Sequence, residues 1–294
     1  MTHPSTSTLY PLLGERLSLE IKPRERLAVL HFNDPSIRNA ISAEAASALS
    51  ELVTQCQSQN QSHPVAQLIH NGTLLVLILK SHVAGTFLAG GDLKAIANFT
   101  PEEGQKFTDD MRSFTQFLRE GPLVSVAALA GVAAGGGSEI ALACDLRVAL
   151  EANLRIDLAQ SRWGVPAGWG MMNDLRARGI YGSERRRGIA VASHESWNIS
   201  QLSWFGLLDA RFDNSPNPEF SFQTWLEDFV VRLADCPELL RRALIIDRPK
   251  QSTSNLEDFD KALFSRFWLG EVHLKRIVAY IQKRLAKNRE STQS

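Results

Sequence analysis

The stretch Ala130-Gly131-Val132-Ala133-Ala134-Gly135-Gly136-Gly137-Ser138-Glu139, which continues into Ile140–Asp145, decides the fold of this chain. Glycine has no side chain, so a glycine turn can approach another backbone or a ligand closely. The turn is expected to open a helix, whose first amides lack intrahelical partners and carry the positive end of the dipole. Two such amides directed at one carbonyl oxygen would stabilise an oxyanion. A plain structural turn is the commoner reason for a glycine triplet.

The first glycine turn in chain order is Phe87-Leu88-Ala89-Gly90-Gly91-Asp92-Leu93-Lys94, about 45 residues before this second turn. Each turn follows an apolar run of strand length. Runs of this length occur at Leu27–Phe32, Leu74–Leu79, Leu123–Leu129 and Leu146–Leu150. Helical patterns lie between them, one after Ser42 and one behind a capping box at Thr100–Glu103 that ends at Gly121. This alternation predicts an α/β fold.

The last third of the chain has a different pattern. Asp213–Glu219 is rich in Pro and Asn and predicts a linker. Apolar spacing then predicts one amphipathic helix over Phe222–Leu233 and a second from about Leu256 to Leu285. We therefore expect two parts, residues 10–212 and residues 213–294.

Composition narrows the class of protein. Of 294 residues, 32 are basic and 32 acidic, so no overall field favours nucleic acid or an anionic membrane. The three cysteines are widely spaced, which predicts neither a disulfide framework nor a zinc site. The longest apolar run, Leu74–Leu79, is far shorter than the roughly 20 residues of a membrane span, and no secretory signal is evident at the start. These features predict a cytoplasmic protein.

Together and in this order, the motifs resemble those of the crotonase, or enoyl-CoA hydratase/isomerase, family. Asn33–Ser42 is similar to the family's early N-x-P-x-x-R-N-A-L-S segment, and Ala89–Lys94 is similar to A-G-A-D-L-K. Gly135–Glu139 matches G-G-G-x-E, and Cys144–Arg147 matches C-D-L-R. Trp197–Asp209 resembles a later family helix that ends in G-L-V-D.

The resemblance implies a spiral of ββα units followed by a helical trimerisation region, in trimers or pairs of trimers. It implies a coenzyme A thioester or an acyl-carrier-protein thioester as ligand, with no metal and no prosthetic group. Gly91 and Gly136 would supply the two oxyanion-hole amides. The coenzyme A would lie along residues of the two early motifs and the second turn: Arg38, Ala40, Ala89, Gly91, Asp92, Leu93, Lys94 and Gly136.

The reaction depends on acid–base groups. Glu139 matches the first of two glutamates that family hydratases use, although a glutamate in a first helical turn is also favoured by the dipole. The segment that should carry the second glutamate reads Arg155–Pro166, and it places either Gln160 or Ala159 at that position. A glutamine holds water but does not exchange protons near neutral pH. Asp157 could substitute, or could be an ordinary loop carboxylate.

Three hypotheses follow. The first is an enzyme of the hydratase/isomerase type that uses Glu139, with Gln160 in the site. The second is a decarboxylase or another enolate-forming lyase, and the third is a non-catalytic acyl-CoA-binding subunit. Met111, Phe114, Phe117 and Trp169 are candidates to line an acyl pocket, although the first three have the spacing of ordinary core residues.

Overall fold

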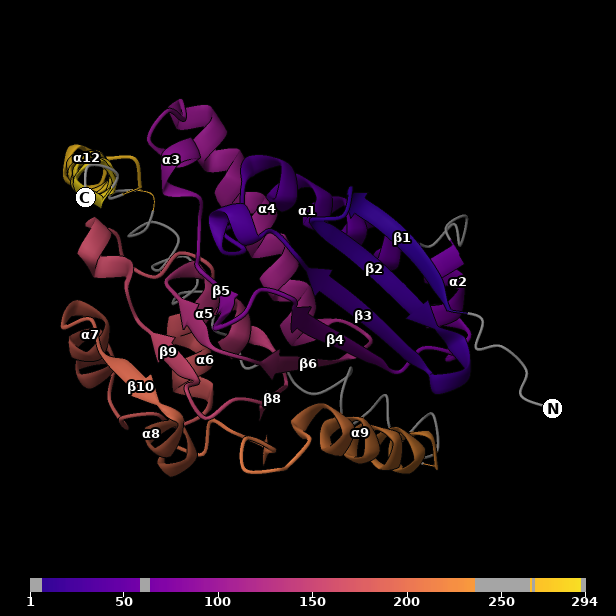
Figure 1. Cartoon of the computed structure of the whole chain (residues 1–294). Coiled ribbons are helices and arrows are strands. Elements are labelled where there is room, and N and C mark those ends of the chain that lie inside the picture. The colour runs from indigo at the N-terminus through magenta and orange to yellow at the C-terminus, as the bar shows by residue number, and fades with distance from the viewer. Residues whose placement is uncertain (1–6, 59–63, 236–264, 266–267, 292–294) are drawn as a thin grey trace.

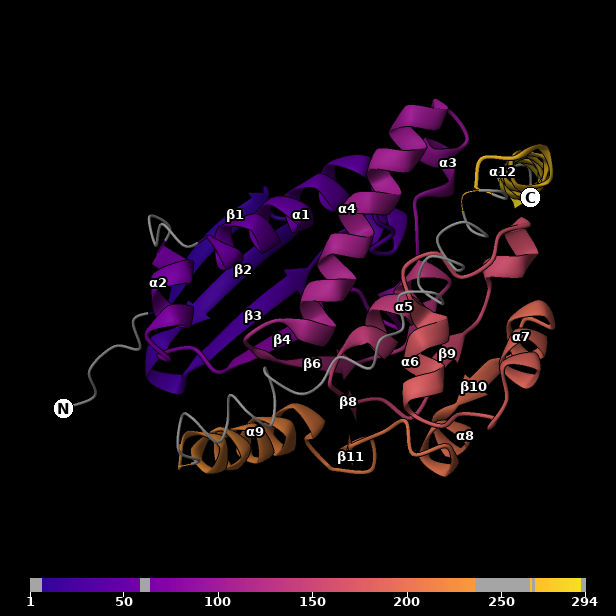
Figure 2. The same cartoon turned by 180° about the vertical axis from the view of Figure 1, so that it is seen from behind.

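The computed structural model describes residues 7–58, 64–235, 265 and 268–291, and Figures 1 and 2 show it from opposite sides. The larger of two sheets has seven strands in the order β1-β2-β3-β4-β6-β8-β11. Their bounds are Thr8–Leu13, Leu17–Lys22, Leu27–Phe32, Val76–Ser81, Val124–Leu129, Leu146–Ala149 and Ala210–Arg211. Strands β1 to β3 are antiparallel, and the pairs from β3 onward are parallel.

The smaller sheet has the order β10-β9-β7-β5, with bounds Ser196–Asn198, Arg155–Asp157, Val132–Ala134 and Thr86–Leu88. The described helices are α1 Ala43–Gln57, α2 Pro64–His70, α3 Leu93–Ile96, α4 Pro101–Glu120, α5 Gly136–Ala143, α6 Met171–Ala177, α7 Glu184–Ala192, α8 Ile199–Trp204, α9 Pro218–Asp235 and α12 Glu271–Ser291. Short 3-10 helices span Pro23–Glu25, Pro35–Ile37 and Gln160–Trp163. The predicted α/β class with a C-terminal helical region is confirmed.

Helices cover both faces of the larger sheet (Figures 1 and 2). Along β3, Leu30 belongs to the core shared with α1 and α4, whereas Val29 belongs to a second core shared with α9. Successive side chains of a strand point to opposite faces, so a strand buried on both faces is apolar throughout. This explains why the central strands were recognisable as continuous apolar runs.

The predicted helix starts and stops are confirmed in the first half of the chain. The Ser42 side chain accepts a hydrogen bond from the Ala45 N–H and begins α1. Thr100 and Glu103 form a reciprocal capping box at the start of α4, which ends at Gly121. The helix predicted over Phe222–Leu233 lies inside α9.

Two helix predictions are wrong. The helix predicted over 256–285 begins outside the described residues, and Trp268 and Leu269 form a turn before α12 begins at Glu271. Leu269 has a φ of 56°, and its N–H donates to Nδ1 of His273 at 2.9 Å. Apolar spacing continues through such a turn, so it does not reveal it. Within Trp197–Asp209 only α8 is helical, since β10 precedes it and Gly206 has a φ of 67°.

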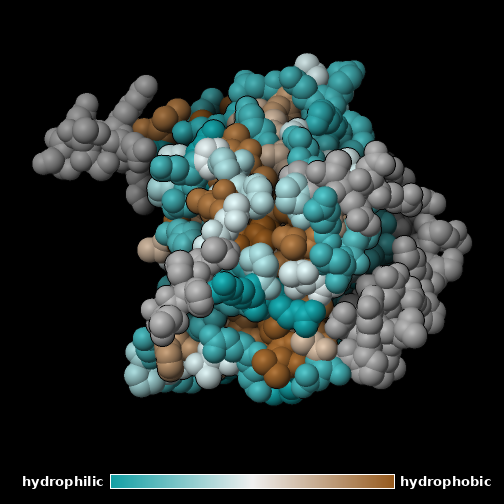
Figure 3. Space-filling model, turned by 90° about the vertical axis from the view of Figure 1, so that its right-hand side faces the viewer, coloured by the Kyte–Doolittle hydropathy of each residue, from teal (hydrophilic) through white to brown (hydrophobic). Residues whose placement is uncertain are grey.

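The outer surface is mixed in character. Figure 3 shows a face that is largely hydrophilic, with hydrophobic residues gathered near its middle and its lower edge. None of the helices in the described ranges combines the length and the apolar character that a membrane crossing requires.

Arg147 of β8 is the basic residue that ends the segment Cys144–Arg147. Its side chain is fully buried, and Nε donates to the Leu207 carbonyl at 2.6 Å. Its other nitrogens donate to the Cys144 carbonyl at 2.6 Å and to Oδ2 of Asp209 at 3.0 Å. The guanidinium therefore joins the end of α5 to the chain that leads into β11.

We expect Arg147→Ala to destabilise the protein by about 3–5 kcal/mol, because the buried carbonyls lose their donors and Asp209 loses its partner. The exposed pair between Arg232 and Asp228 provides a matched control. Arg232→Ala should cost less than about 1 kcal/mol. Urea unfolding of the two variants measures both values, and equal losses would contradict this role of Arg147.

Candidate active site

A cavity of about 520 Å³ lies where the two glycine turns meet. All residues predicted to lie along coenzyme A line this cavity: Arg38, Ala40, Ala89, Gly91, Asp92, Leu93, Lys94 and Gly136. The candidate acid–base residues Glu139, Gln160, Asp157 and Ala159 line it as well. Segments far apart in the sequence therefore meet at one cavity.

The two glycine turns contact each other through their backbones. A Cβ atom at Gly137 would lie 2.1 Å from the Leu88 carbonyl oxygen. A Cβ atom at Gly90, whose φ is 97°, would lie 3.2 Å from the Gly136 nitrogen. Side chains at these positions would separate the turns, so glycine is required here.

Gly91 and Gly136, whose amides are predicted to form the oxyanion hole, both line the cavity. Gly136 is the first residue of α5, so its N–H has no intrahelical partner. Gly91 lies in a bridge with Ile41, whose bonds run from the Ile41 N–H to Gly90 at 2.7 Å and from the Asp92 N–H to Ile41 at 2.9 Å. The bridge thus fixes the turn without using the Gly91 amide.

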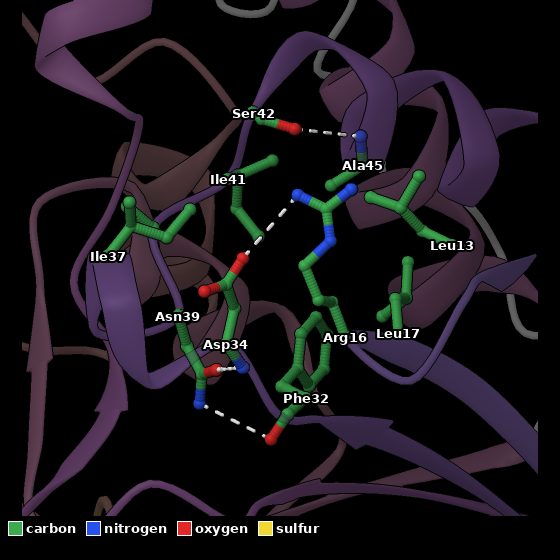
Figure 4. Close-up of a pocket in the computed structure, with 11 residues that line it drawn as sticks. Leu13, Arg16, Leu17, Phe32, Asp34, Ile37, Asn39, Ile41, Ser42 and Ala45 are labelled. Atoms are coloured by element: carbon green, nitrogen blue, oxygen red, sulfur yellow. Dashed lines mark hydrogen bonds and ion pairs between the residues drawn. The ribbon is translucent and has the colours of Figure 1, made fainter.

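Asn39 attaches the Asn33–Ser42 segment to the first glycine turn. Its Oδ1 accepts from the Asp34 N–H at 2.7 Å, and its Nδ2 donates to the Phe87 carbonyl at 3.2 Å. Figure 4 shows Asn39 beside Asp34, whose carboxylate forms an ion pair with Arg16 at 3.7 Å. These contacts hold the neighbouring Arg38 and Ala40 at the cavity.

Glu139 is buried in the first turn of α5, and N–H groups surround its carboxylate. Oε1 accepts from the Gly168 N–H at 3.1 Å. Oε2 accepts from the Trp169 N–H at 2.6 Å and from the Met171 N–H at 3.4 Å. Burial raises the pKa of the Glu139 carboxyl, and these hydrogen bonds oppose the rise. The carboxylate thus fixes the 168–171 turn against α5.

Helix α4 holds the same turn from its other side. Arg112 donates to the Gly168 carbonyl at 2.7 Å, and Thr115 donates to the Trp169 carbonyl at 2.8 Å. Arg119 also donates to the Trp169 carbonyl and forms an ion pair with Asp174 at 2.6 Å. The N–H groups of the 168–171 turn bind Glu139, and its carbonyl groups accept from side chains of α4. The turn is therefore held on both sides and has little freedom to move.

Gln160 contacts Glu139 through its side chain. Its Nε2 donates to Oε1 of Glu139 at 3.3 Å and to the Gly135 carbonyl at 3.1 Å. Ala159 carries no acid–base group. The Asp157 carboxylate is bound elsewhere, by Arg155 at 3.0 Å and by the Ser196 hydroxyl. Of the positions that the sequence left open, Gln160 therefore faces Glu139.

An aromatic wall borders the cavity, defined here as Trp169, Phe107 and Trp268. The Trp169 ring lies over Gly136, where an added Cβ would be 2.2 Å from Cζ3. Phe107 meets Trp169 edge-on at 5.8 Å and stacks on Trp268 at 6.0 Å. These rings give the space next to the Gly136 amide an apolar boundary.

The sequence analysis identified only part of this boundary. Trp169 lines the cavity, whereas Met111, Phe114 and Phe117 are buried core residues that do not line it. Trp268, His273 and Tyr280 line it from the C-terminal region, and no local motif marked them. Burial lowers the pKa of His273 to about 4, so its ring is neutral at pH 7. In the described part of the chain, no group of three His, Cys, Asp or Glu side chains could hold a metal ion.

Comparison with known proteins agrees with this geometry. The enoyl-CoA hydratase/isomerase profile matches residues 23–185, more than half of the chain. A crystal structure of human mitochondrial delta3-delta2-enoyl-CoA isomerase superposes with a TM-score of 0.73, at 22% identity over 93% of this chain and 99% of that one. The enoyl-CoA hydratase of Bacillus halodurans gives 0.71, at 15% identity over 90% of this chain and 100% of that one. The chain belongs to the enoyl-CoA hydratase/isomerase family and has the crotonase fold.

Curated relatives match over part of their length. An enoyl-CoA isomerase/hydratase of Mycosarcoma maydis is 31% identical over 179 residues, which cover 60% of this chain and 61% of that protein. Enoyl-CoA hydratase domain-containing protein 2 of Bos taurus, a mitochondrial protein, is 32% identical over 158 residues. That match covers 54% of this chain and 49% of the bovine protein. The chain thus spans about half to three-fifths of these relatives.

We expect Glu139 to make stability fall as pH rises. A carboxyl whose pKa is higher when folded binds its proton more tightly in the folded state, so its contribution is present below the ordinary value of 4.5 and is lost as pH rises through the folded value. Glu139→Gln removes this pH dependence and otherwise changes the free energy of unfolding by an amount that does not vary with pH. Urea unfolding from pH 4 to 8 measures the difference.

Glu44→Gln is the matched control for this prediction. The pKa of Glu44 is lowered, chiefly by a hydrogen bond with Ser42, so its contribution has the opposite sign. A difference between the native protein and Glu139→Gln that stays constant with pH would contradict the assignment.

Proposed function

We propose that the cavity binds an acyl-CoA thioester and that Glu139 moves a proton on its acyl group, as in an isomerase. The Gly91 and Gly136 amides would bind the thioester oxygen as negative charge develops on it. The observation that carries the proposal is the position of one buried carboxylate, Glu139, three residues after Gly136 in the same helix. Family membership supports the substrate class.

The contact between Glu139 and Gln160 favours isomerisation over hydration. Moving a double bond needs one group that removes a proton at one carbon and returns it at another. Hydration needs a second group to activate water, and the amide of Gln160 does not exchange protons near pH 7. A single acid–base residue therefore suits the first reaction better.

Decarboxylation is the less suitable alternative. Its substrate carries a second carboxylate, which would approach the carboxylate of Glu139 and the amide oxygen of Gln160. Both groups are hydrogen-bond acceptors, so they repel an anionic acyl group. A subunit that binds acyl-CoA without turnover is the remaining alternative, and the experiment below separates it.

Several expectations from the sequence stay predictions. These are the division into residues 10–212 and 213–294, the trimer or dimer of trimers, the absence of a prosthetic group, and the choice of coenzyme A over a carrier protein. The cytoplasmic location also stays a prediction, and several relatives carry the word mitochondrial in their names.

The proposal predicts exchange of acyl protons with solvent. The protein is incubated with 3-enoyl-CoA in D₂O, and mass spectrometry follows deuterium uptake and the appearance of 2-enoyl-CoA. Glu139→Gln should lower both rates by roughly 10²–10⁴-fold, because the general base is lost. Binding with neither deuterium uptake nor formation of 2-enoyl-CoA in the native protein would identify a binding subunit, and CO₂ release from malonyl-type thioesters would identify a decarboxylase.

Exposed cations at the cavity should bind the phosphates of coenzyme A. Lys94 lines the cavity, is exposed and follows the first glycine turn. Lys94→Ala should weaken acyl-CoA binding by about 2- to 5-fold and flatten its salt dependence. Lys275→Ala is the control, since Lys275 is exposed and lies outside the cavity lining. Calorimetry at two salt concentrations measures both effects, and equal changes in the two variants would reject the role of Lys94.

A further inference from the structure

The turn formed by Trp268 and Leu269 in the C-terminal region lies directly against helix α4, at Gly104. An added Cβ atom at Gly104 would lie 2.1 Å from Cδ1 of Leu269 and 2.7 Å from Nε1 of Trp268. Gly104 is buried in α4 and is not part of the cavity lining. Glycine inside a helix is unfavourable relative to alanine, so packing is the usual reason for it. At this position the missing side chain leaves the space that the turn fills.

The turn is held on α4 in a specific conformation. Leu269 has a φ of 56°, a left-handed conformation that is costly for a bulky residue. Its N–H donates to Nδ1 of His273 at 2.9 Å, and His273 is buried at the start of α12. This hydrogen bond and the fit against Gly104 offset the cost of the conformation. The turn is therefore seated on α4 by two separate contacts.

The seated turn supports Phe107, which lies one helical turn beyond Gly104. The Trp268 ring stacks on Phe107 with a centroid separation of 6.0 Å and an interplanar angle of 8°. Phe107 in turn lies beside Gly91, where an added Cβ atom would be 3.7 Å from Cζ of the ring. Phe107 also meets Trp169 edge-on at 5.8 Å. One buried ring thus lies between the tail of the chain and the first glycine turn.

We propose that Trp268 is a positioning residue for the oxyanion hole: the seated turn holds Phe107 against Gly91 and so fixes the direction of the Gly91 amide. The inference rests on the proposed function, in which this amide binds the thioester oxygen. The bridge with Ile41 holds the glycine turn through its neighbouring residues, and Phe107 supports it from the side of the cavity wall. A displacement of about 1 Å at a reacting group can lower a rate by about 10²-fold, so a small movement of this ring matters.

Gly104→Ala tests the proposal because it moves the turn without replacing a residue that lines the cavity. The added methyl group would displace Leu269 and Trp268 from α4, and Phe107 would lose its stacking partner. With 3-enoyl-CoA as substrate, we expect kcat to fall by about 10-fold, with a smaller change in KM. Gln105→Ala, at the adjacent exposed position of α4, is the matched control and should leave kcat unchanged.

A conjugated ligand reports on the oxyanion hole itself. The absorbance of 2,4-hexadienoyl-CoA shifts to longer wavelength when hydrogen bonds polarise its thioester carbonyl. We expect this shift in the native protein and in Gln105→Ala, and the loss of most of it in Gly104→Ala. Leu269→Ala removes the Cδ1 atom that the new methyl group would meet. The double variant Gly104→Ala/Leu269→Ala should therefore regain part of the shift and part of kcat.

The native protein separates failure of this inference from failure of the proposed function. If 2,4-hexadienoyl-CoA does not bind to it, or binds without a shift, the proposed function fails and the inference fails with it. If the native protein shows the shift and Gly104→Ala retains it, or loses affinity at unchanged kcat, the positioning role is overturned while the proposed function stands. Trp268→Leu, which removes the stacked ring and leaves α4 unchanged, is judged by the same outcomes should circular dichroism show that Gly104→Ala does not fold.

Discussion

The close contact between two stretches of backbone is the constraint on which the rest of this structure depends. A Cβ atom at Gly131 would lie 2.0 Å from the Gly85 carbonyl carbon, and one at Gly137 would lie 2.1 Å from the Leu88 oxygen. Because no side chain separates these turns, β5 pairs with β7 and α5 starts beside the first turn. The two candidate amides, Gly91 and Gly136, become neighbours only as a result of this contact.

Glu139 connects that contact to the wall of the cavity. Its carboxylate receives N–H groups from Gly168, Trp169 and Met171, and this places the Trp169 ring over Gly136. In the proposed reaction the same carboxylate moves a proton, so it must exchange some of these partners for the acyl group. A neutral amide at position 160 suits this arrangement, because a second carboxylate 3.3 Å away would raise the cost of charging Glu139.

The sequence predicted the parts of the molecule that local chemistry specifies. Strands buried on both faces are apolar throughout, and the Ser42 and Thr100 caps have clear signatures, so these elements were found. Strand β1 was missed because none of its residues is fully buried and Pro11 interrupts its pattern. The turn before α12 was missed because Leu269 adopts its left-handed conformation through a contact with His273 that apolar spacing does not reveal.

The candidate site was predictable to the extent that its residues lie in motifs. Gly91, Gly136 and Glu139 follow from two glycine turns, but the contact of Gln160 with Glu139 depends on how the 3-10 helix Gln160–Trp163 packs against α5. The part of the cavity lined by the C-terminal region depends on still longer-range packing, since Trp268 and His273 come from that region. The core therefore supplies the candidate amides and Glu139, and the tail completes the lining of the cavity. Changes in the tail can then alter which acyl group fits while Glu139 keeps its position.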